Sequence, residues 1–371
     1  MNCSITSVFL CKMYSFSSIL SSRSHIYIGK SLFSQSFVSI LRHDPQSLIL
    51  IQNTFSSFLQ HPISVVSTNQ RLVSSNSSVF LSKCTFSSCF SCSEPGGGLF
   101  VSKSSSIVSI SSCSFLNCTS LASVSIGFLS SMNAGGGGAA IYCSSVSFVD
   151  CCFSQCMSPI RGPSLFIASS GFGDAHLNFT ELCFARNGYC NFHFGQGNPL
   201  VSNVNSSNNH CETLSGGAFT YNGLYNIIQF SYISNCISDD PIAYKAKVLD
   251  FSFSSAFSIS RMCNIVNNSL LSSDKCTLYS YTNTLSLYNF AFISNPEPLI
   301  LSDQGTIKLY NSITDTASFG GGISVEGNTF MYTSSSKPFI EIPLICDKTN
   351  ANTQYNHGKS IIMFQLYLFF V

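Results

Sequence analysis

Several short motifs in this chain contain the residue types that bind metals or phosphates. Cys89-x-x-Cys92 and Cys190-x-x-His193 are pairs of zinc-ligand types. A structural zinc site takes four ligands, and neither pair has a second pair at zinc-site spacing. The glycine run Gly135–Gly138 lacks the Lys-Ser/Thr that follows in a phosphate-binding loop, so it predicts a flexible turn. The sequence therefore predicts no metal site and no cofactor.

Acidic residues were the next candidates, because hydrolysis of a glycosidic bond needs two carboxylates facing each other across it. Asp239-Asp240 is the only adjacent Asp pair, and the Pro that follows makes it typical of a turn. Asp150 and Asp174 stand alone in the sequence. We expect no catalytic residue. A carbohydrate-active lyase or hydrolase is the alternative, and it requires Asp150, Asp174 and Asp239 to meet in one groove.

Composition narrows the class of protein. Charged residues make up 9% of the 371 residues, hydrophobic residues 45%, and the formal net charge is +1. Disordered chains have low hydrophobicity and high charge, so disorder is excluded. A basic stripe for phosphate backbones is missing, so nucleic acid is not expected as a partner. The 33 Phe and 15 Tyr indicate strands, and the chain is expected to be all-β.

A five-point pattern recurs along the chain and accounts for most of these residues. In one copy it reads Val79-x-Leu81-x-x-Cys84-x-Phe86-x-x-Cys89. The intervening positions are mostly small or polar. Copies begin at Ile26, Leu48, Val79, Val108, Val146, Leu177, Tyr225, Phe257, Leu285 and Ile307. The longest gap, between the copies ending at Asn187 and Asn235, either carries a loop or contains a degenerate coil near Pro199–Cys211.

The pattern predicts a strand, a corner and a second strand. Apolar-x-apolar is the period of a strand with one buried face, and the two-residue gap breaks that alternation. Glycine runs such as Gly96–Gly98 precede further short strands in several copies. Three strands and three corners per repeat predict an all-β right-handed parallel β-helix, a solenoid of roughly ten three-strand coils.

Stacked coils would place equivalent residues in columns about 4.8 Å apart. We expect an internal aromatic ladder and, at one corner, an amide ladder of Asn side chains. The aromatic ladder comprises Phe86, Phe115, Phe153 and Phe184, followed by Tyr232 and Phe292. The amide ladder comprises Asn187, Asn235, Asn267 and Asn295.

These repeats resemble a known family. Gly-Gly-Ala-Phe at Gly216–Phe219 and Phe-x-x-Asn at Phe184–Asn187 are similar to repeats of the polymorphic outer-membrane-protein (Pmp-like) family. The motifs at Cys84–Cys89 and Cys113–Cys118 resemble the Cys-rich version found in surface-protein families of parasitic protists. The resemblance covers roughly residues 25–330. It implies a right-handed β-helix with an adhesive role at a cell surface and no catalytic residues.

The 18 Cys have several readings. Those at apolar template positions are expected to be free thiols that act as small hydrophobic residues. A few bridges are expected at corners, such as Cys151 or Cys152 to Cys156. Asn-x-Ser/Thr sequons, which are compatible with secretion, begin at Asn2, Asn76, Asn117, Asn178, Asn205 and Asn267.

The two ends of the chain differ from the repeats. No convincing signal peptide precedes them, because Lys12 interrupts a mildly apolar segment. The apolar run Ile361–Val371 is too short to span a membrane. We favour its interpretation as a truncated membrane anchor, and the alternatives are the hydrophobic tail of a lipid-anchor signal and a final capping strand. The expected organisation is an N-terminal cap over 1–24, β-helix repeats over 25–330 and a C-terminal segment over 331–371.

These observations favour a non-catalytic cell-surface or extracellular β-helix protein that binds an unidentified protein or glycan ligand. The carbohydrate-active enzyme is one alternative. A non-functional fragment of a surface protein is the other. Membrane association would run through the C-terminal segment.

Overall fold

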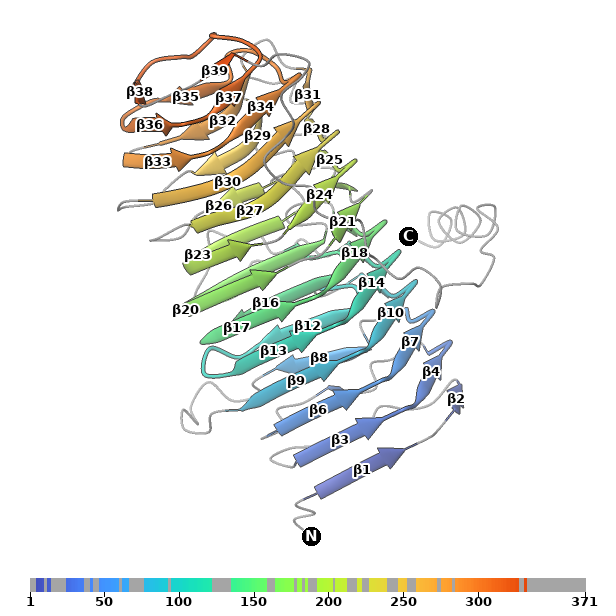
Figure 1. Ribbon diagram of the computed structural model, residues 1–371. Coiled ribbons are helices and arrows are strands. Elements are labelled where there is room, and N and C mark those ends of the chain that lie inside the picture. Colours follow the sequence, from blue (N-terminus) through green and yellow to red (C-terminus); the bar gives the residue numbers. More distant parts are fainter. Residues whose placement is uncertain are drawn as a thin grey trace.

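The computed structural model is all-β, and the described residues contain no helix. Every pairing between their strands is parallel. Figure 1 shows the strands stacked in levels from the blue N-terminal end to the orange C-terminal end. The structure describes residues 5–9, 12–14, 25–36, 41–42, 47–59, 62–66, 77–92, 95–121, 135–158, 164–176, 179–181, 184–185, 192–202, 204–211, 219–221, 227–238, 246–251, 258–271, 275–281, 284–326 and 330–331.

One set of strands, here called the first series, runs through every level. Each member pairs with the next, so that side chains fall into columns. The members are β1 (Ile5–Phe9), β3 (His25–Gly29), β6 (Ser47–Ile51), β9 (Ser78–Ser82), β13 (Ile107–Ser111), β17 (Ser145–Val149), β20 (Leu165–His176), β23 (Phe192–Ser202), β27 (Ile227–Ser234), β30 (Ser258–Val266), β33 (Thr284–Tyr288), β36 (Thr306–Tyr310) and β38 (Ile323–Glu326).

Two further sets of strands follow the first series in each level. The second series comprises β2 (Lys12–Tyr14), β4 (Leu32–Ser34), β7 (Thr54–Ser56), β10 (Thr85–Ser87), β14 (Ser114–Leu116), β18 (Cys152–Ser154), β21 (Phe179–Glu181), β24 (Asn205–Ser207), β34 (Ala291–Ile293), β37 (Ile313–Thr314) and β39 (Phe330–Met331). The third series comprises β5 (Leu41–Arg42), β8 (Ile63–Val66), β12 (Leu99–Ser102), β16 (Ala139–Cys143), β26 (Phe219–Tyr221), β29 (Ala246–Phe251), β32 (Lys275–Ser280) and β35 (Ile300–Ser302).

Four long strands join the three series into one sheet of 32 strands. β20 and β23 belong to both the third and the first series, and β27 and β30 to both the first and the second. A separate sheet of seven strands lies after the second series. It comprises β11 (Phe90–Ser91), β15 (Thr119–Ser120), β19 (Met157–Ser158), β22 (Phe184–Ala185), β25 (His210–Cys211), β28 (Ile237–Ser238) and β31 (Ser269–Leu270).

The long gap between repeats contains an additional coil. The second half of β23 together with β24 and β25 forms a level over Pro199–Cys211, which is the degenerate coil that the spacing left open. β1 and β2 also pair with β3 and β4, so stacking begins inside the segment 1–24 that we set apart as a cap. The first series therefore has more levels than the roughly ten copies visible in the sequence.

In many of the described levels, left-handed backbone occurs at one or two corners. This conformation strains most L-residues and favours Asn and Gly. Between the first and second series, positive φ occurs at Lys30, Gln52, Lys83, Ser112, Asp150, Met262, Asn289 and Asn311. Between the second series and the seven-strand sheet, it occurs at Gln35, Ser57, Ser88, Asn117, Gln155, Asn208, Asn235, Asn267 and Ser294. At each of these corners, one left-handed residue makes the bend that the two-residue gap in the sequence pattern requires.

Glycines before the third series serve two purposes. Gly96 and Gly136 have φ of 78° and 84°, where a side chain would be strained. Gly138 instead leaves room for the core, because a Cβ there would lie 2.6 Å from a ring carbon of Phe153. The residue type at this turn is therefore set partly by the aromatic side chain packed against it.

The core lies between the series, whose outer faces differ. Val79 and Leu81 of β9 are buried, whereas Ser78 and Phe80, which alternate with them along the strand, are exposed. The outer face of the third series is covered instead, because Phe100, Tyr142 and Phe166 form a second buried cluster there. The outer faces of the first series and of the second-series strands β4, β7, β10 and β14 are both at least partly exposed. The large exposed apolar residues Phe80, Ile107 and Val149 lie on the first series.

Candidate functional site

An aromatic column runs up the second series at the centre of the N-terminal levels. The rings of Phe86, Phe115 and Phe153 stack with centroid distances of 4.8 and 4.7 Å, and all three are fully buried. Phe33 and Phe55 extend the stack downward, at 5.4 Å from each other and 4.9 Å from Phe55 to Phe86. Five rings in register therefore form one continuous column.

Between Phe153 and Phe292 the column contains no aromatic residue, which corrects two of the expected positions. The register continues from Phe153 to Thr180, Ser206, Ile233, Ile265 and Phe292. Phe184 lies in β22 and pairs with Met157 in the seven-strand sheet. In this level the first-series residues that pair with β17 at the apolar template positions are Gly173 and Ala175. Because these residues are small, the apolar template does not recognise this strand and misassigns the position of Phe184.

Tyr232 is displaced from the column by one residue. It pairs with Asn205 and Asn264, whereas the buried Ile233 occupies the column. A one-residue slip moves a side chain to the opposite face of a strand. The adjacent pairs Ile227-Ile228 and Tyr232-Ile233 satisfy the apolar pattern in either register, so the sequence pattern alone could not choose. Phe292 does lie in the column, next to Ile265.

The expected amide ladder is two neighbouring columns rather than one. Asn235 and Asn267 are exposed residues with positive φ, and Nδ2 of Asn267 donates to Oδ1 of Asn235 at 2.6 Å. Asn295 lies one position further into the corner, where its Oδ1 accepts from Nδ2 of Asn268 at 2.9 Å. Asn187 lies outside the described residues. The Asn-Asn pair at 267–268 conceals this offset in the sequence.

Either a cysteine or an asparagine occupies the inner corner column, the buried position that follows the left-handed residue of the second corner, in most described levels. Each side chain donates to the backbone carbonyl of the second-series column residue one level below. Cys118 and Cys156 reach the carbonyls of Phe86 and Phe115 from Sγ at 3.5 and 3.4 Å. Asn268 and Asn295 reach those of Ile233 and Ile265 from Nδ2 at 3.3 and 2.6 Å. The two residue types therefore perform the same structural task.

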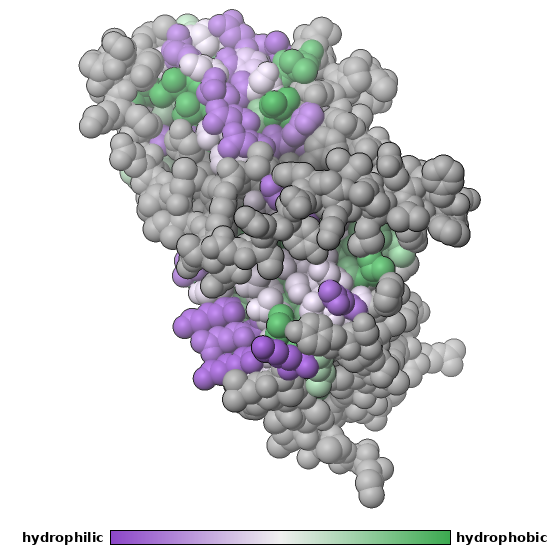
Figure 2. Space-filling view, turned by 90° about the vertical axis from the view of Figure 1, so that its right-hand side faces the viewer, coloured by the Kyte–Doolittle hydropathy of each residue, from purple (hydrophilic) through white to green (hydrophobic). Residues whose placement is uncertain are grey.

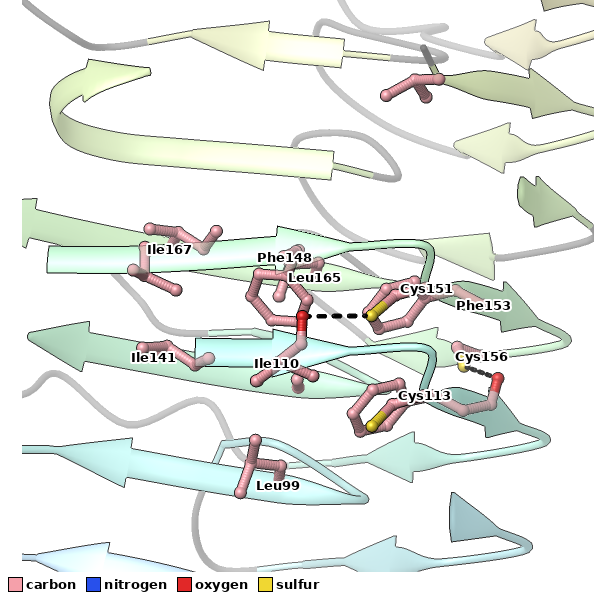
Figure 3. Close-up of a cluster of buried hydrophobic side chains, with 14 of the residues drawn as sticks. Leu99, Ile110, Cys113, Ile141, Phe148, Cys151, Phe153, Cys156, Leu165 and Ile167 are labelled. Atoms are coloured by element: carbon pink, nitrogen blue, oxygen red, sulfur yellow. Dashed lines mark hydrogen bonds between the residues drawn. The ribbon is translucent and has the colours of Figure 1, made fainter. Parts of the chain in front are cut away.

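The first corner repeats this arrangement. Asn53 donates to the carbonyl of Ile28 at 2.8 Å, and Cys151 donates from Sγ to that of Ile110 at 3.7 Å. Figure 3 shows the Cys151 and Cys156 thiols beside Phe153, with the third-series side chains Ile141 and Leu165 facing Ile110 across the core. Buried main-chain carbonyls require donors, which explains why short polar or thiol side chains recur here.

Several thiols of these corners are held in the protonated form at neutral pH, whereas at Cys118 burial is outweighed by hydrogen bonds from Cys156 and Cys89, which lower its pKa well below the ordinary value. Burial raises the pKa of Cys151 and of Cys263 to about 12, and it raises the pKa of Cys89 well above its ordinary value. Only the thiolate is a strong nucleophile or metal ligand. Cys89, Cys151 and Cys263 are consequently hydrogen-bond donors and packing groups.

No disulfide joins the twelve cysteines whose side chains the structure describes. The expected bridge from Cys151 or Cys152 to Cys156 is therefore wrong. Cys151 and Cys156 lie at opposite ends of β18, where each faces a different carbonyl of the level below. Among the described residues, no three His, Cys, Asp or Glu side chains form a group that could hold a metal ion.

The carboxylates named for an enzyme do not converge in the part of the chain that is described. Asp150 is exposed at the first corner. Asp174 pairs with Ser147, three residues before Asp150 and thus about 10 Å away along the strand. Asp239 and Asp240 lie outside the described residues, as do Gly216–Ala218, Cys190 and Ile361–Val371. Within the described ranges no helix has the length and apolar character to cross a membrane.

The open outer face of the first series is the candidate binding surface, defined by the outward side chains of β6, β9, β13, β17 and β30. Phe80 and Ile107 lie diagonally next to each other on β9 and β13, with 38% and 54% of their surface exposed. Val149 and Ile259 are the other large exposed apolar residues there. Serines such as Ser109 and Ser147 lie between them.

No family model, curated protein or solved structure matches this chain.

Proposed function

We propose that this chain is a right-handed parallel β-helix at a cell surface or outside the cell, where it binds a protein or glycan through the outer face of its first series. The parallel in-register levels and the left-handed corners support the fold. The resemblance to Pmp-like repeats supports the surface role. We assign no chemistry to the protein, because Asp150 and Asp174 do not converge in one groove.

One observation carries the binding role. Of the seven large apolar residues that are exposed among the described residues, Phe80, Ile107, Val149 and Ile259 belong to the outer face of the first series. Parallel sheets are usually covered on both faces. Phe80 and Ile107 are exposed apolar side chains next to each other on neighbouring strands, as is typical of interaction sites. Surrounding serines add hydroxyl donors and acceptors without a charge to desolvate, which suits a neutral ligand.

The charge distribution agrees with this choice of partner. The chain has a net charge of +1, so long-range steering of a strongly charged ligand is weak. Figure 2 views the side on which the second-series strands end in Figure 1, and strongly hydrophilic residues gather there in a lower and an upper group.

Binding is tested with the full chain on intact epithelial cells and on immobilised fibronectin, laminin and collagen. The double variant Phe80→Ser with Ile107→Ser is expected to reduce binding at least tenfold. Leu271→Ser is the matched control, because Leu271 is 69% exposed but lies beyond the first series. Equal binding by the wild-type chain, the double variant and the Leu271→Ser variant would contradict the proposal that this face binds the ligand.

Location is tested separately. Intact cells that make the protein are labelled with a membrane-impermeant biotin reagent, and labelling of this chain is expected together with that of known surface proteins. A chain that is labelled only after lysis would overturn the surface role.

A further inference from the structure

Two of the sequons occupy one structural position, the second corner, which lies between the second series and the seven-strand sheet. Asn117 and Asn267 are both exposed there, with φ of 51° in each case. The middle residues Cys118 and Asn268 turn inward and are buried. The hydroxyl residues Thr119 and Ser269 begin β15 and β31. The corner thus directs the asparagine of each sequon to solvent.

The two sites lie on the same edge of the molecule. Thr119 and Ser269 belong to one register column of the seven-strand sheet, through Met157, Phe184, His210 and Ile237. The five intervals between them correspond to about 24 Å at the usual spacing of strands. Carbohydrate at both positions would therefore form a row along one edge.

We propose that Asn117 and Asn267 carry N-linked oligosaccharides. This inference rests on the proposed passage of the chain out of the cell. In the reaction, Nδ2 of the asparagine attacks the anomeric carbon of a lipid-pyrophosphate-linked oligosaccharide. The bond from that carbon to the pyrophosphate breaks, the amide nitrogen loses one proton and the lipid pyrophosphate leaves.

The folded structure accommodates the product at both sites. Asn267 donates from Nδ2 to Oδ1 of Asn235 at 2.6 Å, and Asn117 donates to the Ser88 hydroxyl at 3.4 Å. A glycosylated amide keeps one N–H, so each bond is retained. The glycans would cover the second corner and leave the outer face of the first series open to its ligand.

The same corner offers a matched control. Asn235 is exposed with φ of 52°, and it is followed by the buried Cys236. It lacks a sequon only because Ile237 takes the place of the hydroxyl residue. Ile237 is 37% exposed, so Ile237→Thr creates a sequon at Asn235 without disturbing the core.

The test exports the full chain from cultured human cells behind a cleavable secretion signal. Enzymatic deglycosylation in heavy-oxygen water then labels each occupied asparagine for peptide mass spectrometry. Label is expected at Asn117 and at Asn267. Thr119→Val and Ser269→Ala should each remove one carbohydrate chain, and Ile237→Thr should add one at Asn235.

Two outcomes separate this inference from the proposed function. Exported protein with Asn117 and Asn267 vacant, while the Ile237→Thr variant is occupied at Asn235, would overturn the glycan sites alone. Since the secretion signal is supplied, occupancy is measured whether or not the protein's own cells export it. Failure of the surface labelling described above would overturn the proposed function instead.

Discussion

The N-terminal and C-terminal levels solve the same packing problem with different residues. Over Phe33–Phe153 the second-series column is a stack of five phenylalanines, and cysteines fill most inner corner positions. Over 206–314 the column contains Ser206, Ile233, Ile265, Phe292 and Thr314, and asparagines take over the corner. Backbone register is parallel in both regions.

The difference shows which properties each position requires. The column needs side chains that fit between two neighbours one strand spacing apart, and either stacked rings or aliphatic groups satisfy it. The inner corner needs a short side chain that donates to the carbonyl one level below, and either a thiol or an amide satisfies it. We infer that stability is unevenly distributed, with the stacked rings anchoring the N-terminal levels.

Removal of one ring should have the largest effect. Phe115→Ala is expected to cost about 3–5 kcal/mol, because it opens a cavity in a buried stack. It also breaks ring contacts with Phe86 and Phe153. Phe292→Ala, in the same column but between Ile265 and Thr314, is expected to cost less. Urea unfolding of both variants measures the difference, and an equal or larger loss for Phe292→Ala would refute the special role of the stack.

The corner donors should differ by a smaller amount. Asn268→Ala is expected to cost about 1–3 kcal/mol, because the buried N–H of Cys236 loses its acceptor and the carbonyl of Ile233 loses its donor. Cys118→Ala is expected to cost less, since S–H is a weak donor. Cys118→Asn should remain folded. Loss of the native circular dichroism spectrum in that variant would show that thiol and amide are not equivalent.

Raising the pH should reveal the raised pKa of the buried Cys151 thiol through a smaller loss of folding stability. The pKa of Cys151 is about 12 in the folded chain, against an ordinary value of 9.0. Between these values the unfolded state has lost the proton and the folded state has kept it. Stability is therefore complete below pH 9 and falls as pH rises, by about 1.4 kcal/mol per pH unit for each such thiol.

A single substitution isolates this contribution. Cys151→Ser should lessen the fall in melting temperature between pH 9 and 10.5, and serine already occupies the same corner column at Ser31 and Ser312. Cys92→Ala is the control, because Cys92 is exposed. Identical slopes for wild type and Cys151→Ser would mean that the Cys151 thiol titrates normally in the folded chain.

Prediction from the sequence succeeded where the template is unambiguous. The spacing of Val79, Leu81, Cys84, Phe86 and Cys89 recurs unchanged at Val108–Cys118, and the stack through Phe115 and Phe153 follows from this repetition. It failed at Phe184, where Gly173 and Ala175 occupy template positions without being large apolar residues, and at Tyr232, where the adjacent Ile233 allows a second register. The sequence did not identify the candidate binding face. The exposure of Phe80 and Ile107 required the structure.

The sequence by itself determined the all-β class, the strand-corner-strand unit and the stacking of Phe86, Phe115 and Phe153, because alternation and spacing along the chain dictate which side chains share a face. Tertiary structure decided the register of the irregular levels, the two asparagine columns and which outer face stays open. These depend on hydrogen bonds between levels and on the covering of one sheet by residues distant in sequence. A local pattern contains no information about either.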